Sequence, residues 1–320
     1  MMIEISTDIN KAKKILENNE LVAIPTETVY GLAGNIYSET AIKKIFETKK
    51  RPFYNPLIVH IHNKKLIDEI AINIPEKARI LADAFWPGSL TLLLEKNTKI
   101  PDIVTAGRNS VAVRVPNHPL TLELLKALNF PLAAPSANPF GSISPTRAQH
   151  VADYFSNDIA MVLEGGNCEN GIESTIIGFK NDQPILYRLG SISIEEIEVL
   201  VGPLKVKNHS EKLPESPGML SRHYAPKTKT ILVEDIEKEL SLHSNKRIGV
   251  IVFKTIIDKT NINYTEILSE KGDLKEAMSN LYAAMHRLDK LKLDLIIAQK
   301  FPEEGLGKSI NDRLERATKE

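Results

Sequence analysis

The sequence has a single cysteine, Cys168, among its 320 residues. One thiol can form no internal disulfide and cannot supply a cysteine cluster for a metal, which fits a reducing compartment. The apolar runs are too short to cross a bilayer, and the first residues lack the basic and apolar regions of a signal peptide. We therefore expect a cytoplasmic protein with no membrane partner.

The chain also lacks an excess of charge of either sign. Lysine plus arginine and aspartate plus glutamate both number 41, so the net charge is zero. Proteins that coat nucleic acid or a membrane surface normally carry a basic excess, so any contact with a polyanion must come from a local patch. Hydrophobic content of 42% and charged content of 26% describe an ordinary globular protein, of one large domain or two smaller ones.

Short apolar segments alternate with amphipathic ones up to about residue 205, which predicts an α/β domain. Helices are expected at 38–47, with Ser38 as N-cap, at 75–85 and 120–128, and after a capping box at 193–196. Strands are expected at 21–24, 57–61, 90–94, 111–115, 131–134, 159–163, 174–179 and 185–189.

The pattern stops between residues 206 and 227, where polar residues and prolines predominate. A segment this long without periodicity is a linker or a functional lid. Beyond it, strands at 231–233, 248–253 and 293–298 and helices at 234–242 and 274–291 indicate a second, smaller α/β domain. The predicted division is therefore 1–205, 206–227 and 228–320.

Polar residues follow two of the predicted strands directly. Thr26, Glu27 and Thr28 come after the strand at 21–24, and Ser136-Ala137-Asn138 follows the strand at 131–134. Small polar ligands usually bind at the ends of strands in α/β sheets. Taken alone, the second segment is more simply an Asx or Ser turn.

Several cations stand where an anionic ligand could use them. Lys49 and Arg51 flank a predicted helix end and suit a triphosphate, although a solvated basic helix end is the simpler reading. Arg114 lies in a strand of valine and alanine, with Ser110 on the same face by the two-residue period. Arg188 likewise lies in a predicted strand of apolar residues. A lone arginine in a strand usually extends its charged end to the surface.

Three tempting motifs fail. Residues 305–309 (GLGKS) end like a phosphate-binding loop, but Pro302 occupies the position of the required first glycine, so we expect a helix start there. His60 and His62 lack partners at ligand spacing, so no metal site is predicted. Cys168 has no histidine nearby in sequence, and we interpret it as an incidental thiol.

Taken together, the chain resembles the threonylcarbamoyl-AMP synthase family, the YrdC-like proteins in their long, two-domain form. The resemblance is carried by the ordered segments 25–32, 49–60, 86–88, 113–116, 134–138, 173–176, 187–190, 216–226 and 305–314. One departure is Lys50, where a glycine is common. The resemblance implies an open, twisted, mixed sheet with helices around a large concave cleft, plus a small Rossmann-like C-terminal α/β domain.

The resemblance also implies a reaction, in which L-threonine, bicarbonate or CO₂, and ATP give threonylcarbamoyl-AMP and pyrophosphate. Mg²⁺ would travel with ATP, held mainly by its phosphates. The product would feed N6-threonylcarbamoyladenosine formation on tRNA, through a separate transferase; direct contact with RNA would be weak. No protein nucleophile is needed, so catalysis would rest on positioning and charge stabilisation.

Residue roles follow from the matching motif positions. The threonine-site positions are Thr28, His60, Arg114, Ala134 and Ser174. The ATP-site positions are Arg51, Asn55, Ser110, Ser136, Ser144, Arg188 and Tyr224. The expected catalytic set is Lys49, Arg51, Ser136 and Asn138. Tyr224 would belong to a lid that folds over ATP and protects a hydrolysable product from water.

Two other functions remain open at this stage. An RNA-binding module would bind more tightly at low salt without ATP turnover, but zero net charge argues against it. A regulatory sensor of an amino acid or carbamate would use the second domain as its output. A Lys49→Ala variant that binds threonine but makes no product would favour the enzyme over the sensor.

Overall fold

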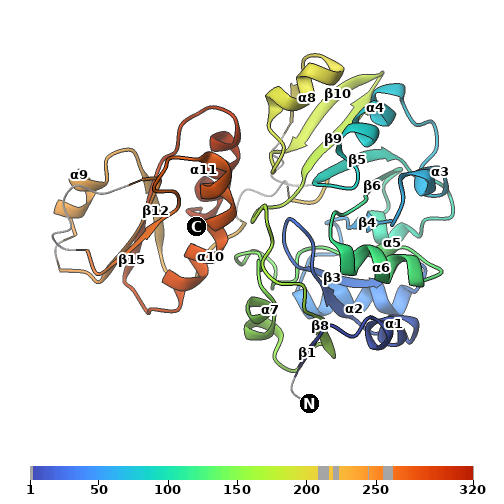
Figure 1. Ribbon diagram of the computed structural model, residues 1–320, viewed down its shortest axis with the longest axis horizontal. Coiled ribbons are helices and arrows are strands. Elements are labelled where there is room, and N and C mark those ends of the chain that lie inside the picture. Colours follow the sequence, from blue (N-terminus) through green and yellow to red (C-terminus); the bar gives the residue numbers. More distant parts are fainter. Residues whose placement is uncertain (1–2, 208–215, 219–222, 244, 255–261, 320) are drawn as a thin grey trace.

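The computed structural model describes residues 3–207, 216–218, 223–243, 245–254 and 262–319. Two α/β bodies lie side by side, and helices α10 (Leu274–Asp289) and α11 (Leu306–Ala317) of the smaller body face the larger one (Figure 1). The predicted fold class, a large mixed sheet followed by a small α/β domain, is confirmed.

The larger body is built on an eleven-stranded mixed sheet. In spatial order its strands are β1 (Glu4–Ser6), β8 (Met161–Leu163), β2 (Val22–Ile24), β3 (Gly31–Asn35), β7 (Leu132–Ala133), β4 (Ile58–His60), β6 (Ser110–Arg114), β5 (Leu90–Glu95), β9 (Thr175–Lys180), β10 (Gln183–Arg188) and β11 (Lys205–Val206). Strands β4 and β6 are parallel, with His60 opposite Arg114. Their carboxyl ends therefore meet at one edge, where α/β sheets usually bind ligands.

Helices cover this sheet and are fixed by ordinary end signals. They are α1 (Ile9–Glu17), α2 (Glu39–Lys49), the 3₁₀ helix η1 (Lys64–Leu66), α3 (Ile67–Ile70), α4 (Glu76–Phe85), α5 (Asp102–Thr105), α6 (Pro119–Ala127), α7 (Ala148–Phe155) and α8 (Ile194–Val201). The predicted N-cap is confirmed, because Ser38 Oγ accepts the Ala41 amide at 3.2 Å. The capping box of Ser193 and Glu196 is also present.

The smaller body has a four-stranded sheet in which every pair is parallel. Its strands, in spatial order, are β12 (Thr230–Val233), β15 (Leu295–Gln299), β13 (Ile248–Val252) and β14 (Tyr264–Ile267), and its helices are α9 (Ile236–Ser241), α10 and α11. Parallel strands need helical crossovers and are buried on both faces. This explains the uninterrupted apolar strands β13 and β15.

Strand β6 shows how the period of two divides the two faces of the large sheet. Val111, Val113 and Val115 belong to the main core beneath the helices. Ala112 packs in a smaller apolar cluster on the opposite face. Arg114 shares the face of Ala112, as the alternation predicts, and this is the face that carries the pocket.

The two bodies contact each other through polar groups as well as apolar ones. His286 Nε2 lies 3.1 Å from the carbonyl oxygen of Ser144, and its ring stacks on His150 at 3.9 Å between centroids. Ser309 Oγ donates to the carbonyl oxygen of Gly190 at 2.7 Å. Helices α10 and α11 therefore rest directly on loops of the larger body.

Most predicted elements are present with shifts of one or two residues, including the helix start at Gly305, which is the N-cap of α11. The sequence interpretation missed α1, η1, α3, α5, α7, β1, β3, β11 and β14. Strand β3 reads GLAGN and has no β-branched residue, so only its pairing with β2 and β7 makes it a strand.

The predicted linker at 206–227 lies partly outside the described residues, which omit 208–215 and 219–222. Strand β11 ends at Val206 in the large sheet, and β12 starts at Thr230 in the small one. The division of the chain at 205 and 228 stays a prediction.

Candidate active site

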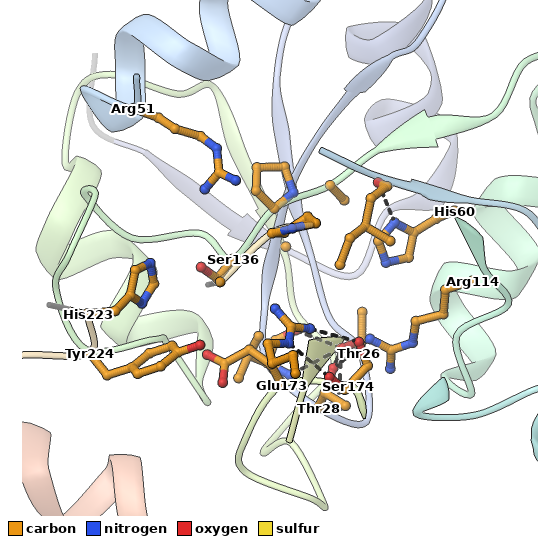
Figure 2. A pocket seen from close by; sticks show the side chains of 18 residues that line it. Thr26, Thr28, Arg51, His60, Arg114, Ser136, Glu173, Ser174, His223 and Tyr224 are labelled. Carbon is orange, nitrogen blue, oxygen red and sulfur yellow. Dashed lines mark hydrogen bonds between the residues drawn. The ribbon is translucent and has the colours of Figure 1, made fainter. Parts of the chain in front are cut away.

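A pocket opens where β4, β6 and β7 end and where the segment before β9 approaches them (Figure 2). The side chains at its wall come from elements far apart in the sequence. Nine of the predicted site residues line it: Thr28, Arg51, His60, Arg114, Ala134, Ser136, Ser174, Arg188 and Tyr224. Thr26, Glu173, Pro217, Gly218 and His223 line it as well.

At one end of the pocket the guanidinium of Arg114 is paired with a carboxylate. Nη2 donates to Glu27 Oε1 at 2.6 Å, Nη1 donates to Thr28 Oγ1 at 2.9 Å, and Nε donates to the carbonyl oxygen of Gly88 at 3.0 Å. Both partners of the ion pair are buried. These three bonds hold the planar fork in one orientation and leave its two remaining N–H groups for a ligand.

His60 lies beside this ion pair as a neutral imidazole. Burial, followed by the nearby charge of Arg114, lowers its pKa from 6.5 to about 3. Its Nδ1 lies 3.2 Å from the carbonyl oxygen of Ile58, so Nδ1 carries the proton and donates to that oxygen. Nε2 is therefore left as an acceptor suited to an N–H or O–H of a ligand.

The polar loop after β2 is organised by its own hydroxyl groups. Thr26 Oγ1 donates to the carbonyl oxygen of Val29 at 2.7 Å and accepts the amides of Thr28 and Val29 at 3.2 Å. The loop is buried, so these bonds satisfy backbone groups that water cannot reach. They also fix the Thr28 hydroxyl against Arg114.

At the other end of the pocket, cations are held by carbonyl oxygens. Lys49 Nζ donates to the carbonyl oxygens of Ser136 and Asn138. Burial, and then the charge of Arg51, lowers the pKa of Lys49 well below its usual value. A bound anion would oppose this lowering of the pKa, because it would supply the missing opposite charge.

Arg51 is placed by the turn that follows helix α2. Its guanidinium donates to Asn55 Oδ1 and to the carbonyl oxygen of Pro56, both at 2.7 Å. Burial and the charge of Arg188 lower its pKa to about 9. The turn itself passes through Lys50, which has φ = 52° as the C-cap of α2. This left-handed conformation explains why a glycine is common at that position.

Arg188 completes the cationic group. Strand β10 has a register shift between Leu186 and Arg188. Arg188 then donates to the carbonyl oxygen and to the hydroxyl of Ser174, at 3.0 and 2.9 Å. Within the described part of the chain, no carboxylate lies at ion-pair distance from Lys49, Arg51 or Arg188. This end of the pocket therefore holds three cations without a carboxylate at ion-pair distance, and the carboxylate of Glu173 acts on Arg188 only from farther away.

Two linker residues close the pocket from the side of the smaller body. Tyr224 is buried with φ = 62°, and its hydroxyl finds no hydrogen-bond partner among the described residues. His223 Nδ1 is likewise without one. Figure 2 shows both side chains directed into the pocket, Tyr224 toward Glu173 and His223 on the side of Arg51 and Ser136. Unpartnered buried polar atoms of this kind are ready to bind a ligand.

The remaining predicted site residues lie behind or outside the wall. Lys49 and Asn138 stand behind Ser136, Asn55 bonds to Arg51, and Ser144 donates to Glu173 at 2.6 Å. Ser110 is different, because it starts β6 and Arg114 ends it, about 13 Å away by the rise of a strand. Ser110 lines a separate groove beside Tyr187, and its role in nucleotide binding stays a prediction.

Sequence reasoning assigned no role to Glu27, Glu173 or His223, although all three lie in the resemblance segments. The two carboxylates act through partners far away in the sequence: Glu27 bonds to Arg114, and Glu173 bonds to Ser144, Tyr282 and Arg313. A single sequence gives no signal for such pairings.

The two carboxylates described at the pocket, Glu27 and Glu173, are both occupied by N–H and O–H donors. Among the residues that the structure describes, no cluster of three or more histidine, cysteine, aspartate or glutamate side chains could hold a metal. In the same residues, no helix is long and apolar enough to span a membrane.

Two family models match the chain. The model described as "Telomere recombination" (Sua5, YciO and YrdC) matches residues 14–190. The model described as "Threonylcarbamoyl-AMP synthase, C-terminal domain" matches residues 192–318. Together they cover both α/β bodies.

Curated relatives agree with these matches. The threonylcarbamoyl-AMP synthase of Bacillus subtilis is 40% identical over 98% of this chain and 94% of its own. That of Pyrococcus abyssi is 38% identical over 97% of this chain and 94% of its own. The fission yeast enzyme, from Schizosaccharomyces pombe, is 33% identical over 98% of this chain and 89% of its own.

The arrangement of both bodies also matches a solved structure. The crystal structure of Pyrococcus abyssi Sua5 complexed with L-threonine superposes with a TM-score of 0.92 at 37% identity, covering 99% of this chain and 97% of that one. Escherichia coli YciO, at 20% identity and a TM-score of 0.51, shares the fold over 59% of this chain. Sequence, domain order and structure agree, and the chain belongs to the threonylcarbamoyl-AMP synthase family, whose members are enzymes of the nucleotidyltransferase type.

Proposed function

We propose that this enzyme makes L-threonylcarbamoyl-AMP and pyrophosphate from L-threonine, CO₂ or bicarbonate, and ATP. The observation that carries the proposal is the contrast between the two ends of one pocket. The cation at one end, Arg114, is paired with Glu27, whereas Lys49, Arg51 and Arg188 at the other end are held without carboxylates. A zwitterion suits the first end and a polyphosphate suits the second.

Threonine binds at the Arg114 end. The two remaining N–H groups of Arg114 take the carboxylate, as a planar fork does. His60, neutral at physiological pH, accepts from the amine or hydroxyl. The Ala134 backbone and the Ser174 hydroxyl, which also line the pocket, orient the amino acid. The solved structure of the Pyrococcus abyssi relative contains L-threonine.

ATP binds at the other end. Arg51 and Arg188 contact the phosphates, with Asn55, Ser136, Ser144 and Ser110 as further nucleotide positions, and Mg²⁺ accompanies the phosphates. Lys49 and Asn138 hold the backbone of the loop that carries Ser136. The lowered pKa values of Lys49 and Arg51 indicate a site whose charge is balanced only when an anion is bound.

The chemistry then needs position and charge more than a protein nucleophile. The threonine amine adds to CO₂ and loses a proton, which gives a carbamate. A carbamate oxygen forms a bond to the α-phosphorus of ATP, and the bond from that phosphorus to the bridging oxygen of pyrophosphate breaks. Lys49, Arg51 and Arg188 stabilise the charge that grows on the phosphoryl oxygens and on the leaving group.

The linker residues Tyr224 and His223 act as a lid over the nucleotide. Both are buried and line the pocket. Excluding water matters here because the product is a mixed anhydride that hydrolyses readily. The product passes to a separate transferase that modifies adenosine in tRNA, and any direct contact of this chain with tRNA is weak.

The test is product formation with each substrate withheld in turn. Pyrophosphate release should require both threonine and bicarbonate, and mass spectrometry with labelled threonine should find the label in a threonylcarbamoyl adenylate. ATP turnover that is indifferent to threonine would contradict the proposal. RNA binding that strengthens at low salt, without any ATP turnover, would favour a binding protein instead.

A further inference from the structure

A carboxylate lies inside the pocket at the end proposed for ATP. Glu173 is buried and lines the pocket beside Arg188 and Tyr224. Its Oε1 accepts from Ser144 Oγ at 2.6 Å, and Ser144 is one of the proposed nucleotide positions. A negative charge at this place opposes the binding of a triphosphate unless a cation balances it.

The balancing cation comes from the other body of the molecule. Arg313 of helix α11 has an exposed fraction of 0%, and its Nε donates to Glu173 Oε2 at 2.9 Å. Tyr282 of helix α10 donates to the same oxygen at 3.0 Å. The Glu173 carboxylate is therefore surrounded by donors, two of which belong to the smaller body.

Arg313 is itself held rigidly. Nη2 donates to the carbonyl oxygen of Leu189 at 2.6 Å, Nη1 donates to Asp312, and the guanidinium carbon lies 4.9 Å from the ring centre of Tyr224. One side chain thus touches the carboxylate in the pocket, the strand end next to Arg188, and the aromatic ring of the lid. These contacts fix where the Glu173 carboxylate stands and toward which groups it presents its charge.

We propose that Arg313 is a positioning residue for ATP, through which the C-terminal domain neutralises and orients Glu173 so that the nucleotide end of the pocket stays cationic. The inference rests on the proposed function, since it takes ATP as the anionic ligand. It gives the smaller body a direct part in substrate binding. The effect should be selective, because ATP carries several negative charges and threonine is a zwitterion without net charge.

The test replaces Arg313 in the full chain and measures steady-state pyrophosphate release. In Arg313→Gln, the uncompensated Glu173 should raise the KM for ATP about tenfold, while the KM for threonine changes less than about threefold. The double variant Glu173→Gln/Arg313→Gln no longer has the negative charge of Glu173, so its KM for ATP should return to within about threefold of wild type. Arg313→Lys keeps the charge but loses part of the fork's bonds, so its KM for ATP should lie between those of wild type and Arg313→Gln.

Lys308→Gln is the matched control, because Lys308 also crosses between the bodies from α11, pairing with Glu195 at 2.6 Å on the exposed surface. It should leave both KM values unchanged. If Arg313→Gln does not fold, the test rests on the double variant Glu173→Gln/Arg313→Gln. A double variant that folds and has a near-normal KM for ATP supports the inference. A double variant that keeps a raised KM for ATP, or does not fold, overturns it.

The outcomes separate this inference from the proposed function. A wild-type chain that releases no threonine-dependent pyrophosphate contradicts the function. An active wild type in which Arg313→Gln lowers only kcat and the melting temperature, with both KM values unchanged, overturns the inference alone. That result would make Arg313 merely structural.

Discussion

The two ends of the pocket use arginine in opposite ways. At the end proposed for threonine, Arg114 forms a buried ion pair with Glu27 and is fixed by two further bonds. At the end proposed for the nucleotide, Arg51 donates only to neutral oxygens of Asn55 and Pro56, and burial lowers its pKa to about 9. Arg114 is therefore held in one orientation for contact with a ligand, whereas the charge of Arg51 is balanced only when an anionic ligand binds.

This difference follows from the cost of burying charge. A buried cation is tolerated when a carboxylate neutralises it, or when hydrogen bonds keep it in place until an anion arrives. An unbalanced group of cations raises the energy of the empty pocket and so favours polyanionic ligands. Three variants and one pH series test this contrast.

The largest effect is expected for Lys49→Ala. This change removes charge at the nucleotide end and releases the loop that carries Ser136 and Asn138. We expect kcat for pyrophosphate release to fall about 100- to 1,000-fold, as when an oxyanion donor is lost. Threonine affinity by calorimetry should change less than about threefold. Equal losses of threonine binding and turnover would show that the two ends are not separate.

Arg114→Lys tests the opposite end. Lysine keeps the charge but loses the planar fork and its bonds to Thr28 and Gly88. The KM for threonine should rise about 10- to 100-fold, which is less than the loss of a whole buried charge pair would give because the charge is kept, while the KM for ATP changes little. Turnover of the variant with glycine or serine in place of threonine would measure its specificity for the amino acid. An unaltered KM for threonine would place the amino acid elsewhere.

The pH dependence of stability probes histidines at and near the pocket. Burial lowers the pKa of His60 and His150 to about 3 and that of His286 to about 4. The unfolded chain therefore binds more protons than the folded one between those values and pH 6.5, so stability is full above pH 6.5 and is lost as the pH falls. One histidine with a pKa of about 3 lowers the free energy of unfolding by about 2 kcal/mol at pH 5, relative to its value above pH 6.5.

The measurement is denaturant unfolding between pH 7.5 and 4.5. His150→Phe keeps a ring against His286 and should flatten the pH profile, whereas His243→Phe, in the turn just after helix α9 and away from this contact, should not. A profile that is equally steep in both variants would contradict the attribution of the pH dependence to His150. Because His60 stays neutral, the KM for threonine should not follow its titration above pH 5.

The smallest effect is expected for Ser110→Ala. As a nucleotide position, Ser110 would contribute one neutral hydrogen bond, so the KM for ATP should rise about threefold. The KM for threonine should not change. An unaltered KM for ATP would remove Ser110 from the nucleotide end, in keeping with its place at the far end of β6.

Local patterns allowed most of the fold to be predicted. Period-two alternation in β6 placed Arg114 opposite the valines, and the signals at Ser38 and Ser193 marked true helix starts. Strand β3 could not be predicted, because GLAGN is extended only by virtue of its neighbours. The pocket was foreseen as a set of motifs, yet its charge balance was not, since Glu27 and Glu173 act through partners far along the chain.

Short spacings in the sequence were enough to predict the family, the alternation of strands and helices, and the polar side chains available for a site. They could not show that Arg114 forms an ion pair whereas Arg51 bonds only to neutral oxygens. They also could not show that Arg313 of helix α11 pairs with Glu173. Electrostatic roles depend on distances of a few ångströms between residues that are remote in sequence, and these distances exist only in the folded chain.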